Sequence, residues 1–242
     1  MTLRIGFDMD GTLADFGRAF HDVEARLFGA GPHIREGQPE RRESAQSHTS
    51  EPPLQGPVTE DDTAVPAITP LESSRRRAAI WTAIQATPDF WRGLKPLEEG
   101  AVRRIHTLML QHKWEVFFIT QRPYTEGDTV QRQTQKWLVD QGFDLPSVLV
   151  LGGARGVAAA ALRLDFHVDD SLQNCLDVAS DSRARPLLIV QKADAAAVAS
   201  ARRIGVATAP GIGVCLDVLE RATSAQGQPG LLDRLSALVG WR

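Results

Sequence analysis

Hydrophobic and polar positions alternate between strand-like runs and helix-like segments along most of the chain. Short runs rich in β-branched and aromatic residues predict strands near 3–7, 115–120, 147–151, 166–169 and 186–190. Apolar residues at helical spacing predict helices near 14–28, 75–86, 99–112, 129–141, 157–162, 171–179 and 194–204. This order predicts an α/β fold with a parallel sheet and helices on both of its faces.

A segment of different composition interrupts this pattern after the first predicted helix. Between Gly29 and Ile80 the sequence has no aromatic residue, and seven of the 14 prolines lie between Pro32 and Pro70. Such a segment cannot bury much apolar surface, and we expect about 31–74 to be disordered or loosely ordered. Leucines at helical spacing in 226–242 predict a docked terminal helix.

Composition and charge limit the classes of partner. The 242 residues, 43% of them hydrophobic, suffice for one sizeable core plus an appendage. The net charge of −3 gives no overall attraction to polymeric nucleic acid or to an anionic membrane. The chain has no run of about 18 apolar residues, and we expect a cytoplasmic protein without a signal peptide or membrane span. Cys175 and Cys215 lie in helix-like segments without metal-type spacing and are expected to be buried thiols.

Two carboxylates directly follow the first predicted strand. In the run Asp8-Met9-Asp10-Gly11-Thr12-Leu13, the glycine allows a turn just after the second carboxylate, so both can face one pocket. Like charges this close repel, and a divalent cation such as Mg²⁺ or a shared proton is needed to offset the repulsion. A solvated turn uses the same residue types. Five specified positions in a row are rare by chance, however, so the run favours phosphoryl chemistry.

Two other predicted strands end in polar residues. Thr120 closes one of them, and its hydroxyl and the backbone N–H groups after it, at Gln121 and beyond, can hold a phosphoryl oxygen. The other ends at Asp169, followed by Asp170, which can take part in binding a cation or in capping the next helix. Since ligands bind at the carboxyl ends of parallel strands, we expect Asp8, Thr120 and Asp169 to converge.

The run 8–13 resembles the first motif of the haloacid dehalogenase superfamily of phosphohydrolases. The resemblance implies a Rossmann-like parallel sheet, Mg²⁺ as the cofactor and a small phosphomonoester as the substrate. It also implies that Asp8 attacks phosphorus and becomes an aspartyl-phosphate, while Asp10 protonates the leaving oxygen and then activates water. Thr120 matches the second motif, and Thr120 and Gln121 would bind phosphate.

The resemblance further implies a set of metal ligands. Asp8 and Asp169 would bind Mg²⁺ through their carboxylates and Asp10 through its backbone carbonyl. Asp170 would orient ligands or waters from a second layer of contacts. His167, beside these residues in the sequence, is expected to be a packed or hydrogen-bonded core histidine and not a ligand.

The third motif of the family departs from its usual form here. It is normally a lysine, but no lysine lies between Lys136 and Asp169. Arg155 is the best candidate for this phosphate-binding charge, and Arg163 is a weaker one. An ordinary surface arginine is the alternative.

A helical insertion after the first strand is similar to the small cap of many enzymes in this superfamily. We expect 1–13 and 94–242 to form the core and 14–93 to form the cap, with the loosely ordered segment inside it. The cap would select the substrate and exclude water.

The segment around Phe90 and Trp91 is similar to one in the 5'(3')-deoxyribonucleotidases, where aromatic residues hold the base. The similarity implies that Phe16, Phe90 and Trp91 contact a nucleoside monophosphate, by stacking in the case of Phe90 and Trp91. Packing of these rings between cap and core is the alternative. A phosphatase of sugar phosphates or other small metabolites, and a non-catalytic phosphate-binding or scaffold protein, remain open as other functions.

Overall fold

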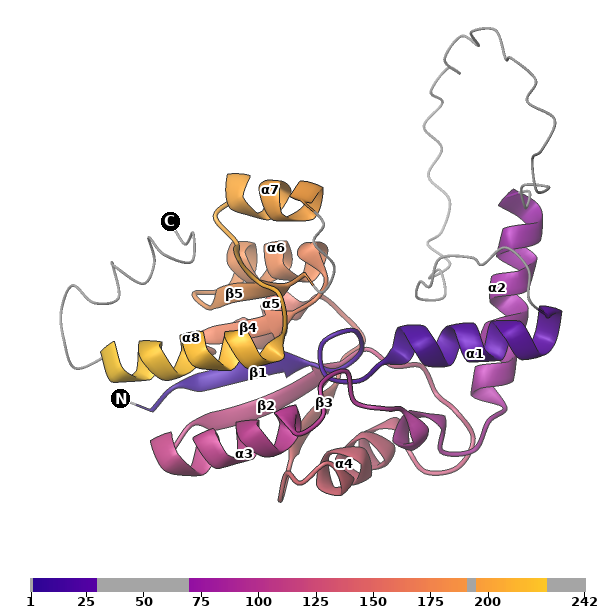
Figure 1. Ribbon diagram of the computed structural model, residues 1–242, viewed down its shortest axis with the longest axis horizontal. Helices are drawn as coiled ribbons and strands as arrows, with labels where there is room; N and C mark the ends of the chain where they lie inside the picture. The colour runs from indigo at the N-terminus through magenta and orange to yellow at the C-terminus, as the bar shows by residue number, and fades with distance from the viewer. Residues whose placement is uncertain (1, 30–69, 191–194, 226–242) are drawn as a thin grey trace, which may run out of the picture. The chain divides into compact units, whose positions relative to one another are not determined.

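The computed structural model describes residues 2–29, 70–190 and 195–225 (Figure 1). Most of the predicted disordered insertion and the whole predicted terminal helix at 226–242 lie outside the described residues. Internal contacts divide the chain into two compact units, one formed by 1–19 and 85–242 and the other by 20–84. The assignment of 14–93 as a cap stays a prediction.

The larger unit contains a parallel sheet of six strands. They are β1 (Arg4–Asp8), β2 (Glu115–Thr120), β3 (Ser147–Val150), β4 (Phe166–Asp169), β5 (Arg185–Ile189) and β6 (Ala207–Ala209). Their order is β3-β2-β1-β4-β5-β6, and every neighbouring pair is parallel. This confirms the predicted α/β fold and places β1 between β2 and β4. Strand β6 was not predicted, because three small residues carry too short a pattern.

Helices connect these strands. They are α3 (Ala101–His112), α4 (Val130–Asp140), α5 (Arg155–Ala161), α6 (Leu172–Asp181), α7 (Ala195–Arg203) and α8 (Ile212–Ala225), with a short 3₁₀ helix η1 (Phe90–Gly93) before α3. Figure 1 shows α3 beside α8 and α5 beside α6, on opposite faces of the sheet. The crossover through α3 runs from β1 to β2, in the opposite direction along the sheet from those through α5 and α6, and crossovers of one hand then place these helices on opposite faces. Within the described part of the chain, none of the helices is long and apolar enough to cross a bilayer.

Both faces of the sheet are buried. Phe118 and Ile119 are adjacent in β2, so their side chains point to opposite faces, and neither is exposed. The Phe118 ring packs edge-on against Phe143, with ring centroids 4.9 Å apart. Ile119 packs in a cluster with Ala159 and Val178, from α5 and α6. Such two-sided burial explains why the strands read as continuous apolar runs.

Glycine allows α5 to lie unusually close to α6. A Cβ atom on Gly156 would lie 2.2 Å from the carbonyl oxygen of Asp177 and 2.6 Å from the Cβ of Asp181. These contacts leave no room for a larger residue at the start of α5. The helix begins at Arg155, two residues before the predicted start, so the close approach also sets the position of that arginine.

The smaller unit is formed by most of α1 (Phe16–Phe28) and by α2 (Pro70–Gln85). Phe20 of α1 and Trp81 of α2 are in edge-to-face contact, with ring centroids 6.2 Å apart. Helix α2 begins five residues before the predicted start at Arg75, so the prediction of disorder was wrong for 70–74. Proline is favourable at the first helical position, and an ion pair between Glu72 and Arg76 supports the first turns.

We expect Gly156→Ala to lower the free energy of unfolding by about 1–3 kcal/mol, because the new methyl group forces α5 away from α6. Chemical denaturation measures this loss. Gly153→Ala is the matched control, since a Cβ there meets nothing within 4 Å and should change stability by less than about 0.5 kcal/mol. Equal stability of the two variants would contradict the close approach.

Candidate active site

The loop after β1 turns sharply against the end of β4. The N–H groups of Leu13 and Ala14 both donate to the carbonyl of Met9, each at 2.8 Å. Gly11 has a φ of 82°, and a Cβ there would lie 2.0 Å from a carboxylate oxygen of Asp170. Only glycine satisfies both the backbone conformation and the contact. The glycine that was predicted to turn the chain therefore also brings the loop against Asp170.

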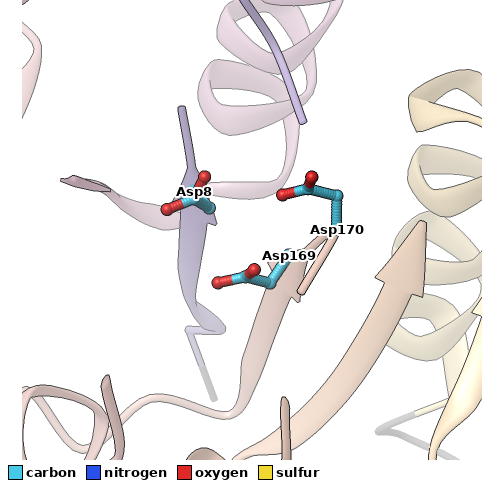
Figure 2. A group of neighbouring side chains, drawn as sticks. All are labelled: Asp8, Asp169 and Asp170. Atoms are coloured by element: carbon cyan, nitrogen blue, oxygen red, sulfur yellow. The ribbon is translucent and has the colours of Figure 1, made fainter. Parts of the chain in front are cut away.

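Three carboxylates meet at the ends of β1 and β4 (Figure 2). One oxygen from each of Asp8, Asp169 and Asp170 lies within 4.8 Å of the others, and we call these residues the acidic cluster. Asp8 and Asp169 are buried, whereas Asp170 keeps contact with solvent. Carboxylate oxygens are the ligands that Mg²⁺ prefers, so the donor set of the acidic cluster fits this ion.

The acidic cluster is electrostatically unfavourable without a cation. Burial, and next the charge of Asp169, raise the pKa of Asp8 well above its usual value, and the positive charge of Arg155 opposes this rise. Loss of hydration, and next the charge of Asp169, raise the pKa of Asp170 to about 7. Part of the Asp170 side chain is still exposed to solvent. A bound divalent cation would offset this repulsion.

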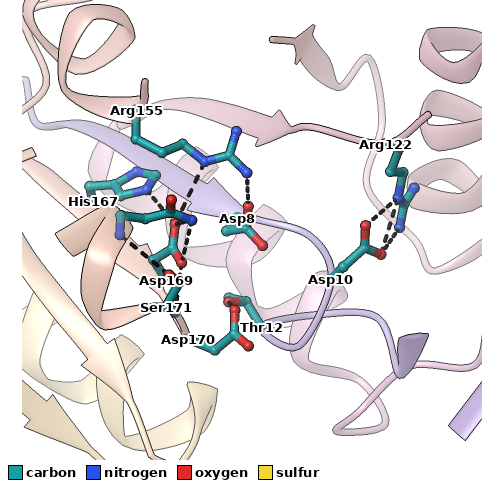
Figure 3. A network of polar contacts seen from close by, with 10 residues as sticks. Asp8, Asp10, Thr12, Arg122, Arg155, His167, Asp169, Asp170 and Ser171 are labelled. Atoms are coloured by element: carbon teal, nitrogen blue, oxygen red, sulfur yellow. Dashed lines mark hydrogen bonds and ion pairs between the residues drawn. The ribbon is translucent and has the colours of Figure 1, made fainter. Parts of the chain in front are cut away.

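Arg155 lies inside the site. Its Nη2 donates to Asp8 Oδ1, and its Nε lies 3.7 Å from Asp169 Oδ2 (Figure 3). Its side chain is buried, which excludes the alternative of an ordinary surface arginine. Nε and Nη1 have no hydrogen-bond partner among the described residues. Nη1, a buried donor beside Asp8 without a hydrogen bond among the described residues, suits an oxygen of a phosphoryl group.

Asp169 is held by several donors. His167 Nε2 lies 3.0 Å from Asp169 Oδ2, and the Ser171 N–H donates to Oδ1 at 2.8 Å. The Asn174 side-chain amide lies 3.1 Å from both oxygens. The expectation of a buried, hydrogen-bonded His167 is confirmed. Such contacts fix the orientation of a ligand carboxylate.

Asp10 lies outside the acidic cluster and faces Arg122 (Figure 3). Arg122 Nε donates to both carboxylate oxygens of Asp10, at 3.1 and 2.9 Å, and Nη2 donates to Oδ1 at 2.7 Å. Arg122 was not among the site residues predicted from the sequence. Its one local signal was its position two residues after Thr120, at the carboxyl end of a strand predicted to line the site.

Other predicted residues vary in their placement. Thr120 is buried at the end of β2, next to the strand that ends in Asp8, and Gln121 is half-buried directly after it. Arg163 precedes β4 and thus lies at the opposite end of that strand from Asp169. Arg155, and not Arg163, is therefore the arginine at the site. The roles of Thr120 and Gln121 in binding phosphate stay predictions.

Phe16, Phe90 and Trp91 form a cluster of rings. Phe16 lies 5.6 Å from Trp91 and 6.5 Å from Phe90, measured between ring centroids. Trp91 is 1% exposed, its Nε1 donates to the carbonyl of Pro123, and the Arg122 guanidinium lies 4.9 Å from its ring centroid. These contacts favour the alternative in which Trp91 packs inside the protein. The stacking of Trp91 on a base stays a prediction, and the burial of its ring speaks against it.

No protein-family model matches the chain, and no curated protein matches it by sequence. Among solved structures, it is similar to a putative β-phosphoglucomutase from Thermotoga maritima, with 18% identity and a TM-score of 0.52 over 90% of this chain and 99% of that one. The chain has a haloacid dehalogenase-like fold. At this identity the likeness concerns the haloacid dehalogenase-like fold alone.

Two more solved structures are similar to the chain. A haloacid dehalogenase-like family hydrolase from Streptococcus pneumoniae has 11% identity and a TM-score of 0.40, over 78% of this chain and 85% of that one. A haloacid dehalogenase hydrolase of family IA, variant 3, from Entamoeba histolytica has 11% identity and a TM-score of 0.46, over 88% and 94%.

We expect the melting temperature of the metal-free protein to fall as the pH rises from about 5 to 8. The folded-state pKa of Asp170, about 7, lies above its usual 3.8, so its stabilising contribution is complete below about pH 4 and disappears as the pH rises through about 7. Asp8 acts in the same direction. Thermal melts should also show that Mg²⁺ stabilises the protein more at about pH 8 than at about pH 5.

Asp170→Asn should flatten this pH dependence. Asp140→Asn, at the exposed ion pair with Arg92, is the control and should keep the wild-type slope. A stability that rises with pH in the absence of metal would contradict the electrostatic analysis of the acidic cluster.

Proposed function

We propose that the protein is a Mg²⁺-dependent phosphomonoesterase that acts through an aspartyl-phosphate on Asp8. The observation that carries the proposal is the meeting of Asp8 with the rest of the acidic cluster and with buried Arg155. It brings a nucleophilic oxygen, ligands for a cation and donors for an anion to the carboxyl ends of adjacent strands. The resemblance of 8–13 to the first motif of the haloacid dehalogenase superfamily supports the same reaction.

Asp8 and Asp169 would hold Mg²⁺ through their carboxylates, with Asp170 beside them. The resemblance to the haloacid dehalogenase superfamily adds the backbone carbonyl of Asp10 as a further ligand. When bound, the ion neutralises negative charge on the carboxylates and on the phosphoryl group. Arg155 supplies a second positive charge next to Asp8, which favours the ionised, nucleophilic form of that carboxylate. Its Nη1, which has no hydrogen-bond partner among the described residues, would donate to a phosphoryl oxygen.

The reaction has two halves. In the first, an oxygen of Asp8 bonds to phosphorus, the bond between phosphorus and the leaving oxygen breaks, and Asp10 gives that oxygen a proton. In the second, water bonds to phosphorus while Asp10 takes its proton, and the bond between phosphorus and Asp8 breaks. Inorganic phosphate leaves, and both aspartates return to their initial states.

Two classes of substrate are compared for this site, nucleoside monophosphates and smaller phosphomonoesters. A nucleoside monophosphate is the finer proposal, but it depended on Phe90 and Trp91 as a platform for a base, and both rings are buried. A sugar phosphate or another small phosphomonoester needs no aromatic platform. The burial of the rings therefore favours a small substrate of this second kind.

We expect the purified protein to hydrolyse p-nitrophenyl phosphate in the presence of Mg²⁺, and Asp8→Asn to lower kcat by at least about 10³-fold, because the amide cannot act as the nucleophile. Release of inorganic phosphate measures the rate. Asp140→Asn, outside the site, is the control. Wild-type protein that binds Mg²⁺ and phosphate without turnover would instead support a non-catalytic phosphate-binding role. Sugar phosphates and nucleoside monophosphates assayed in parallel compare the two substrate classes.

We expect Arg155→Met to lower kcat/KM by about 10²–10³-fold, because it removes the donors and the positive charge beside Asp8. Arg155→Lys should retain more activity than Arg155→Met, since it keeps the charge but loses the planar fork. Steady-state kinetics with one aryl phosphate measures both variants. Wild-type activity in Arg155→Met would show that Arg155 takes no part in phosphate binding.

A further inference from the structure

The carboxylate of Asp10 is held in one orientation by a single side chain. Three hydrogen bonds of 2.7–3.1 Å join it to Nε and Nη2 of Arg122, so that both carboxylate oxygens are engaged. Two-point contact with a planar guanidinium fixes the rotation of a carboxylate as well as its position. A single contact would leave that rotation free.

Arg122 is itself immobilised. Its side chain is completely buried, and its remaining terminal nitrogen, Nη1, donates to the Thr134 hydroxyl of α4 at 2.9 Å. Its guanidinium carbon lies over the ring of Trp91, 4.9 Å from the centroid. Burial of an arginine is costly unless its donors are satisfied, and here the contacts define a single position for it.

The supports of Arg122 are connected to one another. The Trp91 indole donates to the carbonyl of Pro123 at 3.0 Å, and the Trp91 backbone N–H donates to the Gln133 side chain of α4 at 3.1 Å. Helix α4, η1 and the segment after β2 are thus linked around Arg122. This arrangement resists movement of the guanidinium and, through it, of Asp10.

We propose that Arg122 is the positioning residue that aims the Asp10 carboxyl group at the leaving oxygen of the substrate. The inference rests on the proposed function, in which Asp10 transfers a proton to that oxygen. Proton transfer requires donor and acceptor within hydrogen-bond reach, and a misplacement of about 1 Å can cost about 10²-fold in rate. Arg122 touches neither the acidic cluster nor Arg155 in any of the contacts of the described residues, so it acts through Asp10.

The test uses the acidity of the leaving group. An alkyl phosphate such as glycerol phosphate needs a proton on its leaving oxygen, whereas p-nitrophenyl phosphate releases a stable anion and needs it far less. We expect Arg122→Met to lower kcat on the alkyl phosphate by about 10²-fold and on the aryl phosphate by less than about 10-fold, with KM little changed. Arg122→Lys, which keeps one donor group near Asp10, should fall between wild type and Arg122→Met.

Two further variants make the test specific. Asp10→Asn should show the same selective loss, and the Asp10→Asn, Arg122→Met double variant should be no slower than Asp10→Asn alone. Arg92→Met is the matched control, because Arg92 also pairs with an aspartate, Asp140 at 2.9 Å, but outside the site. Its ratio of alkyl to aryl activity should equal that of wild type.

Thermal melts show whether each variant folds. The affinity for Mn²⁺, used as a probe of the proposed Mg²⁺ site, should be equal in wild type and Arg122→Met. If Arg122→Met does not fold, Thr134→Val removes one support of the guanidinium and should shift the ratio in the same direction by a smaller factor. If a folded Arg122→Met variant loses kcat equally on the two substrates, or keeps the wild-type kcat on both, the positioning role is overturned and the phosphatase proposal stays intact. Absence of hydrolysis of both substrates by wild-type protein would refute the proposed function and this inference together.

Discussion

The interaction between Arg155 and the buried carboxylates of Asp8 and Asp169 is the constraint on which the rest of the site depends. Two negative charges lie at adjacent strand ends away from water, and one guanidinium lies against both. Burial and the charge of Asp169 raise the pKa of Asp8 and disfavour its ionised form, and the positive charge of Arg155 opposes that rise. The parallel register of β1 with β4, and the close packing of α5 on α6 at Gly156, bring these groups together.

Asp8 and Asp10, two residues apart in the sequence, have different arginine partners. Asp8 lies in the acidic cluster beside Arg155, while Asp10 faces Arg122 (Figure 3). Gly11, the residue after Asp10, turns the chain at this point. Different partners suit different chemical tasks, since a nucleophile must stay ionised near a cation and a proton carrier must reach the leaving oxygen.

The burial of Phe90 and Trp91 favours a structural role for these residues over contact with a substrate. Phe90 and Trp91 resemble base-binding residues in their sequence context, yet Trp91 is almost fully buried and supports the guanidinium of Arg122. Its indole nitrogen is already engaged by a backbone carbonyl. In the proposed enzyme, Trp91 therefore contributes to the orientation of Asp10, and small phosphomonoesters are the better candidates for the substrate.

The sequence by itself determined the fold class and the placement of Asp8 and Asp169 at strand ends, because strand periodicity and turn residues are local properties. Only the tertiary structure decided the partner of Asp10, since Arg122 is 112 residues away in the chain. It also decided the burial of Trp91. Contacts between distant residues depend on how helices and strands pack, and no local pattern in a single sequence records which guanidinium meets which carboxylate.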